Sequence, residues 1–202
     1  MSIDFTKLDW QKNSDGLLPA VIQDAETGTV LMLGYMNEEA LRVTQETRLV
    51  TFYSRSKKRL WKKGETSGNT LKLASADADC DRDALLIRAI PAGQTCHNGT
   101  RSCFSATESP LETIGLLLQT IKERSESAAA DSYTKQLLNG GIDAYGAKVL
   151  EEAEEVVRAA RCEGRQRTIE EASDVLFHLL VLLRGEGIEL SDIAEELRRR
   201  RK

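Results

Sequence analysis

The sequence predicts two domains: an N-terminal mainly-β domain of the α+β class over residues 1–108, and a C-terminal all-α helical bundle over residues 109–202. A change in residue composition and periodicity near residue 110 is the basis of this prediction. Before it, Gly, Thr and β-branched residues punctuate short apolar runs; after it, long stretches of Glu, Ala, Leu and Arg have helical periodicity and contain no Pro. The segment 103–110, with Ser105, Thr107 and Ser109, is expected to be the short connection.

The N-terminal half is expected to contain a hairpin, because the apolar runs 21–23 and 30–36 flank the turn-forming residues 24–28. Asn37 is expected to cap a helix that ends near Arg48, since the side-chain oxygen of Asn accepts a free amide of the first helical turn. Further strands are expected at residues 49–54, 70–73 and 84–90.

Helical periodicity in the second half predicts helices at residues 111–125, 147–162, 168–184 and 191–200. The helix 147–162 is expected to bury one apolar stripe, with acids along its margins. The stripe consists of Val149, Leu150, Ala153, Val156, Val157 and Ala160. The acids are Glu151, Glu152, Glu154 and Glu155.

The helix 168–184 places Glu171 and Asp174 on one face, because they are three residues apart. Residues 175–183 are apolar nearly all round, apart from His178. A helix of this kind is buried on several sides, so both acids are expected to enter a packed bundle. We interpret His178 and Cys162 as structural residues.

The composition limits the classes of function that the protein can have. A chain of 202 residues with 41% hydrophobic content can bury a core. A net charge of -4 argues against general nucleic-acid binding, which depends on Lys and Arg neutralising phosphates. Residues 1–5 lack the layout of a signal peptide, and no apolar run approaches the ~20 residues that cross a bilayer. We therefore expect a cytoplasmic protein with no nucleic-acid or membrane partner, whose basic residues 198–202 end a helix.

Three cysteines, Cys80, Cys96 and Cys103, share the first half with His97. Intracellular chains rarely use disulfides, so thiols of this kind suggest zinc ligands. Three thiolates leave one position of a tetrahedral zinc open, which is typical of a catalytic rather than a structural site. The alternatives are three buried small hydrophobes for the thiols, and a surface loop residue for His97.

Asp79, Asp81 and Asp83 alternate with other residues beside Cys80. If the strand expected at 84–90 begins as early as Asp79, alternation places the three carboxylates on one face and Cys80 on the other, which would separate two metals. Spacing alone leaves two alternatives open, a solvated turn and a site for a hard cation.

Two longer motifs resemble the phosphoribosyl-AMP cyclohydrolase family of histidine biosynthesis: Asp77-Ala-Asp-Cys-Asp-Arg-Asp-Ala-Leu-Leu86 and Cys96-His-Asn-Gly-Thr-Arg-Ser-Cys-Phe104. Residues 9–10, 34–37, 54–56 and 61–69 look like the same family, so the resemblance spans roughly residues 1–105. It implies a homodimer in which Cys96 and Cys103 of one subunit bind zinc with Cys80 of the other, while Asp79, Asp81 and Asp83 hold magnesium. The candidate substrate-binding residues within these motifs are Arg55, Trp61, Lys62, Lys63, Thr66 and Ser67.

The reaction that the resemblance implies can be explained in physical terms. A ribosyl group on N1 of the substrate's adenine makes C6 electrophilic, so zinc-activated water can add there and the N1–C6 bond can break. His97 is our candidate for proton transfer, because an imidazole titrates near pH ~6.5. The basic residues around Trp61 suit the substrate's phosphates, although a solvated charged turn is the alternative.

The second half resembles the all-helical nucleoside triphosphate pyrophosphatases, through Glu151-Glu152-x-x-Glu155 followed by Glu171-x-x-Asp174. Ser132-Tyr133-Thr134, Gly140-Gly141 and Lys148 narrow the resemblance to phosphoribosyl-ATP pyrophosphatase. It implies that Glu152, Glu155, Glu171 and Asp174 bind magnesium and serve catalysis, with Lys148 on the substrate. A solvated face is the alternative for the 151–155 run.

We therefore expect a bifunctional hydrolase of histidine biosynthesis that uses Zn²⁺ and Mg²⁺. The C-terminal domain would release pyrophosphate from phosphoribosyl-ATP, and the N-terminal domain would open the adenine ring of the product. One alternative is a housecleaning nucleotide hydrolase fused to an unrelated zinc deaminase. The other is a non-enzymatic dimerisation module that zinc holds together.

Overall fold

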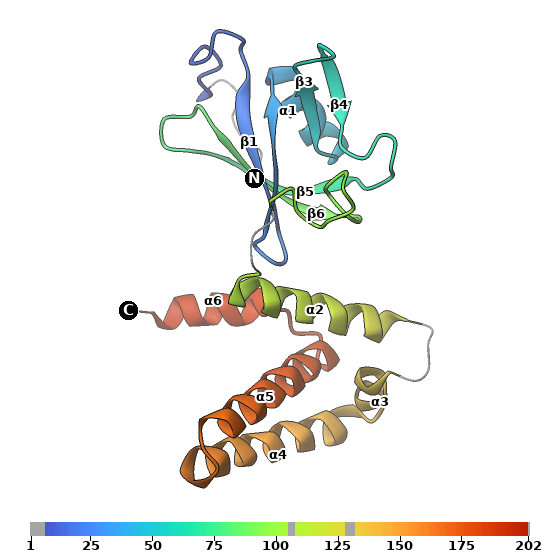
Figure 1. Ribbon diagram of the computed structural model, residues 1–202, viewed down its shortest axis with the longest axis vertical. Helices are drawn as coiled ribbons and strands as arrows, with labels where there is room; N and C mark the ends of the chain where they lie inside the picture. The colour runs from blue at the N-terminus through green and yellow to red at the C-terminus, as the bar shows by residue number, and fades with distance from the viewer. Residues whose placement is uncertain (1–6, 105–107, 128–131, 202) are drawn as a thin grey trace. The chain divides into compact units, whose positions relative to one another are not determined.

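The computed structural model describes residues 7–104, 108–127 and 132–201. The chain forms two compact units, residues 1–115 and residues 116–202. The strands and one helix lie in the first unit and the remaining helices follow, so the expected fold class is confirmed (Figure 1). Ser105 and Thr107 of the expected connection lie outside the described residues, and the boundary between 108 and 109 stays a prediction. Among the described residues, no helix is long and apolar enough to cross a membrane.

The first unit is built on a four-stranded sheet in the order β2-β1-β6-β5. Strand β1 runs parallel to β6 and antiparallel to β2, while β5 and β6 are antiparallel. A separate antiparallel pair is formed by β3 and β4. The strands are β1 (Leu18–Asp24), β2 (Val30–Met36), β3 (Thr51–Ser54), β4 (Arg59–Lys62), β5 (Leu71–Ala78) and β6 (Leu85–Pro91).

The expected hairpin and capped helix are both confirmed. Strands β1 and β2 pair antiparallel, and α1 (Glu38–Thr47) follows at once. The Asn37 Oδ1 atom accepts the amide N–H of Ala40 at 2.8 Å, which satisfies one of the free donors of the first turn. Residues Ala40 and Leu41 of α1 are fully buried in the same core as Phe52.

Strand β4 was not expected, because its basic residues suggest a solvated turn rather than a strand. Its register places Trp61 opposite Phe52 of β3, and the two rings stack with centroids 5.6 Å apart. The aromatic contact supplies the cross-strand packing that a short strand needs.

The second unit consists of helices, and one of them was not expected. The helices are α2 (Pro110–Glu126), α3 (Tyr133–Asn139), α4 (Gly141–Cys162), α5 (Arg165–Gly185) and α6 (Leu190–Arg200). The first residues of α2 belong to the first unit. The short α3 is capped by Ser132, whose Oγ accepts the N–H of Lys135 at 3.3 Å. Its seven residues are too few to show a helical period in the sequence.

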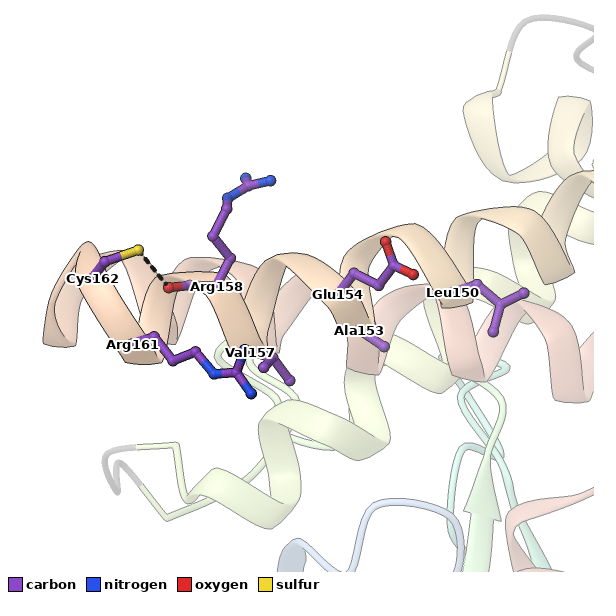
Figure 2. A pocket seen from close by; sticks show the side chains of 7 residues that line it. All are labelled: Leu150, Ala153, Glu154, Val157, Arg158, Arg161 and Cys162. Carbon is purple, nitrogen blue, oxygen red and sulfur yellow. Dashed lines mark hydrogen bonds between the residues drawn. The ribbon is translucent and has the colours of Figure 1, made fainter.

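The stripe expected to be buried on α4 is wrong. The residues that α4 buries are Tyr145, Glu152 and Ala159, which recur every seven positions. In contrast, Leu150 is 70% exposed and Val157 is 49% exposed. Figure 2 shows their side chains along the helix with Ala153 and Arg161, where they line a shallow pocket. The helix has apolar residues on more than one face, and packing against α5 selects the face that holds Glu152.

Candidate metal centres

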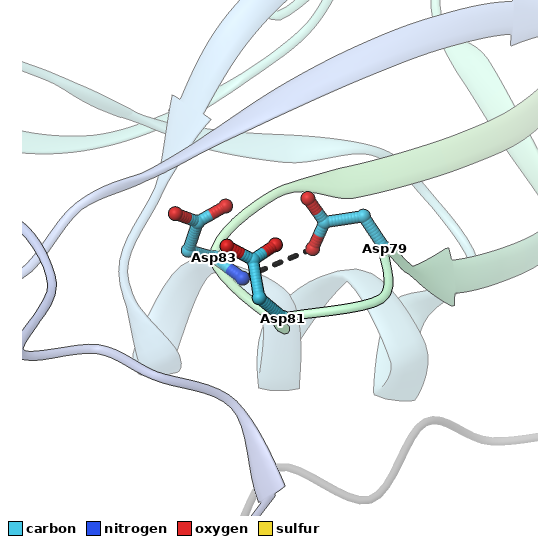
Figure 3. A group of neighbouring side chains, drawn as sticks. All are labelled: Asp79, Asp81 and Asp83. Carbon is cyan, nitrogen blue, oxygen red and sulfur yellow. Dashed lines mark hydrogen bonds between the residues drawn. The ribbon is translucent and has the colours of Figure 1, made fainter.

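The three aspartates of the first unit come together in the turn that joins β5 to β6 (Figure 3). Asp79, Asp81 and Asp83 each place a carboxylate oxygen within 4.8 Å of the other two. The Asp79 Oδ1 atom accepts the N–H of Asp83 at 3.0 Å and that of Ala84 at 3.1 Å, which closes the turn. Strand β6 begins only at Leu85, so the strand alternation expected from Asp79 onward is wrong. A turn, not the face of a strand, gathers the carboxylates.

A lysine from the N-terminal segment lies against this group. The Lys12 ammonium is 3.2 Å from Asp81 Oδ2 and 3.1 Å from Asp83 Oδ2. The Asp83 and Asp81 carboxylates raise the pKa of Lys12, and the hydrogen bond from Lys12 lowers the pKa of Asp81. The amide N–H of Asp9 donates to the Arg82 carbonyl at 2.9 Å, which attaches the segment to the turn.

Two of the three cysteines lie close together. Cys96 and Cys103 bracket a loop after β6, and each thiol shifts the pKa of the other. The pKa of Cys96 lies below its ordinary value, chiefly through the backbone of Asn98, whereas burial raises the pKa of Cys103. Among the described residues, no set of three potential ligand atoms within 4.8 Å of one another includes Cys80, Cys96 or Cys103. One chain therefore does not bring its three thiols together.

The candidate proton-transfer residue lies beside this pair. The Nδ1 atom of His97 is 3.9 Å from the Cys96 Sγ, and the side chain is exposed. The imidazole is therefore accessible to a molecule that approaches the thiols.

The candidate substrate-binding residues of the first unit occupy the β3–β4 hairpin and the turn after it. The Arg55 guanidinium lies 3.8 Å above the centre of the Tyr35 ring, a cation–π contact that orients it. Lys63 is buried, and its charge lowers the pKa of Cys103, which places it near the thiol pair. Lys62, Thr66 and Ser67 are exposed.

In the second unit, three glutamates from two helices converge. Glu152 and Glu155 of α4 and Glu171 of α5 place carboxylate oxygens within 4.8 Å of one another. Glu171 is 1% exposed and Glu152 is 7% exposed, so this is not a solvated acidic face. Asp174 is exposed and outside this group, which corrects the expectation that both acids of α5 enter a packed bundle.

Three cations of the same unit contact the glutamates, and one of them is Arg158, whose Nη2 lies 3.2 Å from Glu155 Oε1. Lys148 Nζ lies 3.0 Å from Glu152 Oε1, and Arg167 Nη2 forms an ion pair with Glu171 Oε1. The pair does not satisfy hydrogen-bond geometry, and the buried Glu171 Oε1 has no hydrogen-bond partner among the described residues. Burial raises the pKa of Glu171; the Arg167 charge opposes this effect, while Glu155, Glu152 and Asp174 add to it. Arg167 already supplies a positive charge at this oxygen, so a metal ion that binds there has to displace the guanidinium.

His178 connects this group to α3. Its Nδ1 lies 2.9 Å from the Asp174 carbonyl, which can only accept, so this nitrogen donates. Its Nε2 is hydrogen-bonded to the Tyr133 hydroxyl at 3.1 Å, and Glu152 Oε1 lies 3.8 Å from Nδ1. His178 is buried and hydrogen-bonded at both nitrogens, as expected for a structural residue, whereas Cys162 is exposed.

Sequence reasoning missed the partners of these acids. Lys12 is 69 positions from Asp81, and no local signal connects them. Arg167 lies four residues before Glu171, and this helical spacing could have identified it.

Comparisons with known proteins agree with the division into two units. Residues 32–105 match the family model for phosphoribosyl-AMP cyclohydrolase, and residues 116–201 match that for phosphoribosyl-ATP pyrophosphohydrolase. The histidine biosynthesis bifunctional protein HisIE of Xylella fastidiosa strain Temecula1 is 50% identical, over 96% of this chain and 92% of that protein. The HisIE proteins of Escherichia coli K12 and Vibrio cholerae are 48% and 44% identical, over 96% and 97% of this chain and 95% and 94% of theirs.

Proposed function

We propose that the two units of this chain catalyse two successive reactions. The chain belongs to the family of bifunctional histidine-biosynthesis proteins, with phosphoribosyl-AMP cyclohydrolase and phosphoribosyl-ATP pyrophosphohydrolase activities. The domain over residues 109–202 removes pyrophosphate from phosphoribosyl-ATP. The domain over residues 1–108 then opens the adenine ring of the product between N1 and C6. The observation that carries this proposal is that each unit has its own metal-donor groups, thiols and carboxylates in the first unit and carboxylates alone in the second.

The donor chemistry of the first unit fits two different metals. Soft thiolates such as Cys96 and Cys103 suit zinc, whereas the three carboxylates of the Asp79 turn suit magnesium. A catalytic zinc takes three protein ligands, so the two neighbouring thiols of one chain leave it one protein ligand short. Cys80 does not join these two thiols within one chain, which supports a homodimer in which Cys80 of each subunit binds the zinc held by Cys96 and Cys103 of the other. When bound, zinc supplies Lewis-acid activation of the attacking water.

The residues of the chain then have separate roles at the ring-opening site. His97, exposed beside Cys96, takes and returns the proton at the reacting centre. Arg55, fixed over Tyr35, and Lys62 and Lys63 bind the phosphates, for which cationic side chains are the complementary partners. Trp61, Thr66 and Ser67 line the nucleotide. The buried position of Lys63 near Cys103 brings its charge toward the reacting centre.

The second unit fits magnesium. Its donor set is all oxygen, and the buried Glu171 Oε1, which accepts no hydrogen bond and is ion-paired with Arg167, is the atom at which magnesium would replace the guanidinium. We assign Glu152, Glu155 and Glu171 to the metal, with Asp174 completing the group from the surface, and Lys148 to the triphosphate. When bound, magnesium neutralises charge on the transferred phosphoryl group. The carboxylates also hold the attacking water and accept its proton.

The test is to incubate the full chain with phosphoribosyl-ATP, magnesium and zinc, following pyrophosphate release and the absorbance change on ring opening. Glu171→Gln should lower pyrophosphate release at least about 100-fold and leave ring opening of supplied phosphoribosyl-AMP intact, because it removes one charged magnesium ligand. Cys96→Ser should do the reverse. Mixing the two variants should restore the whole conversion through released intermediate. Loss of ring opening in folded Glu171→Gln would sink the assignment.

The same assay separates this proposal from a housecleaning nucleotide hydrolase. Free non-canonical triphosphates should fail to compete with phosphoribosyl-ATP. Fragments 1–108 and 109–202 should each keep one activity if the domain boundary is correct.

A further inference from the structure

Asp24 is a buried carboxylate at the end of β1, and its two oxygens accept hydrogen bonds from two different parts of the chain. Its Oδ1 accepts the amide N–H groups of Glu26 at 2.9 Å and Thr27 at 3.2 Å, which closes the turn to β2. Its Oδ2 accepts from Arg101 Nη2 at 2.7 Å. The Asp24 side chain is 0% exposed, so its charge requires a partner cation.

That partner cation comes from the loop between the two neighbouring thiols. Arg101 lies two residues before Cys103, and the residues after it also attach to the hairpin. The Ser102 hydroxyl donates to the Val30 carbonyl at 2.7 Å, and the Cys103 N–H donates to the Leu31 carbonyl at 2.7 Å. Three consecutive residues thus attach the end of the loop to the β1–β2 hairpin.

The other thiol is connected to the same anchor through the backbone. The Cys96 N–H donates to the Thr100 carbonyl at 3.0 Å, and the Gly99 N–H donates to the Cys96 carbonyl at 3.1 Å. Cys96 is therefore placed relative to Thr100, the residue directly before Arg101. A shift of the Arg101 backbone would therefore move the backbone that carries both thiols.

We propose that Asp24 and Arg101 are a positioning pair for the Cys96–Cys103 loop, and that they set its zinc affinity by holding the two thiols in place before the metal binds. This inference rests on the proposed zinc site. Residues that orient metal ligands without binding the metal typically change the metal affinity by about 10- to 100-fold when they are removed. The competing explanation is that the pair only stabilises the hairpin, with no effect on the metal.

The test measures zinc affinity of the full chain by competition with a chromophoric chelator, together with the thiolate charge-transfer band after Co²⁺ substitution. Arg101→Met should weaken zinc binding about 10- to 100-fold and lower the Co²⁺ band at fixed metal. Arg101→Lys, which keeps the charge, should recover part of the loss. Arg88→Met is the matched control, because it breaks an exposed Arg–Asp pair of the same unit, 2.7 Å long, away from the loop.

A second variant covers the case in which Arg101→Met unfolds because Asp24 is left unpaired. Asp24→Asn with Arg101→Met removes both charges and keeps an acceptor for the Glu26 and Thr27 amides. It should fold without metal and still bind zinc weakly. Zinc affinity within twofold of wild type in this variant would overturn the inference, and so would a loss of stability that is the same with and without zinc. If wild type and Cys96→Ser bind zinc equally, the zinc site itself is wrong, which is a distinguishable failure.

Discussion

The Lys12 ammonium lies 3.1 Å from an oxygen of Asp83, within the group of carboxylates that we assign to magnesium. A second contact, 3.2 Å to Asp81, places the same cation between two candidate ligands. The ammonium repels a divalent ion at these carboxylates, so we expect magnesium binding to compete with the Lys12 contacts. The N-terminal segment would then respond to metal binding at the turn.

Lys12→Gln should tighten magnesium binding, because it removes the competing cation. We expect the magnesium concentration that gives half-maximal ring opening to fall about twofold to fivefold, the scale of an exposed ion pair. Lys72→Gln, which removes a charge from β5 instead, is the control. A rise in the half-maximal concentration would show instead that Lys12 holds the aspartates in place for the metal.

Mixing Cys80→Ser with Cys103→Ser should regenerate ring opening, although each variant alone is inactive. A heterodimer holds one complete set of ligands, because the Cys80→Ser subunit supplies Cys96 and Cys103 and its partner supplies Cys80. With random exchange of subunits, activity should reach roughly a quarter of wild type. If exchange is demonstrated by mass spectrometry and no activity returns, the shared zinc site is wrong.

Gly34→Ala should destabilise the first unit by about 1–3 kcal/mol, the usual effect of overpacking a core. A Cβ atom at Gly34 would lie 2.4 Å from the Phe52 ring. Urea unfolding followed by tryptophan fluorescence measures this, because both tryptophans, Trp10 and Trp61, lie in the first unit. Adding Phe52→Leu should recover part of the loss; a Gly34→Ala variant as stable as wild type contradicts the contact.

Tyr145 should make the second unit sensitive to alkaline pH. Its hydroxyl donates to Glu186, and this bond, with burial, raises the pKa of Tyr145. A pKa that is higher in the folded than in the unfolded state gives stabilisation that is complete below pH ~10 and lost as pH rises through the folded pKa. The free energy of unfolding, measured by circular dichroism, should therefore fall more steeply for wild type than for Tyr145→Phe above pH ~10. Parallel curves would show that the tyrosine is unperturbed.

Local elements were predictable because their signals are local. The Asn37 cap and the turn after β1 are interactions among residues two to four positions apart. The sequence also identified the acidic clusters of both units, because carboxylates at fixed short spacing form a pattern that can be recognised in the sequence alone. In contrast, α3 was missed because seven residues are too few to show a helical period, and β4 was missed because its basic residues suggest a solvated turn.

The face that a helix buries was not predictable in the same way. On α4 the apolar residues Leu150 and Val157 suggest one buried stripe, yet the helix turns Glu152 toward α5. Periodicity shows only that a helix has faces; the choice among them depends on which neighbour packs there. The same limit applies to Asp79, Asp81 and Asp83, which a turn rather than a strand brings together.

By itself, the sequence determined the two-domain composition, the family and the chemical types of the candidate ligands, since these depend on residue identity and short spacing. The tertiary structure decided which groups meet: Arg101 with Asp24 across 77 positions, and Lys12 with Asp81 across 69. Pairings at such separations depend on the closure of long loops and on the burial of charge, and neither effect produces a periodic pattern in the sequence.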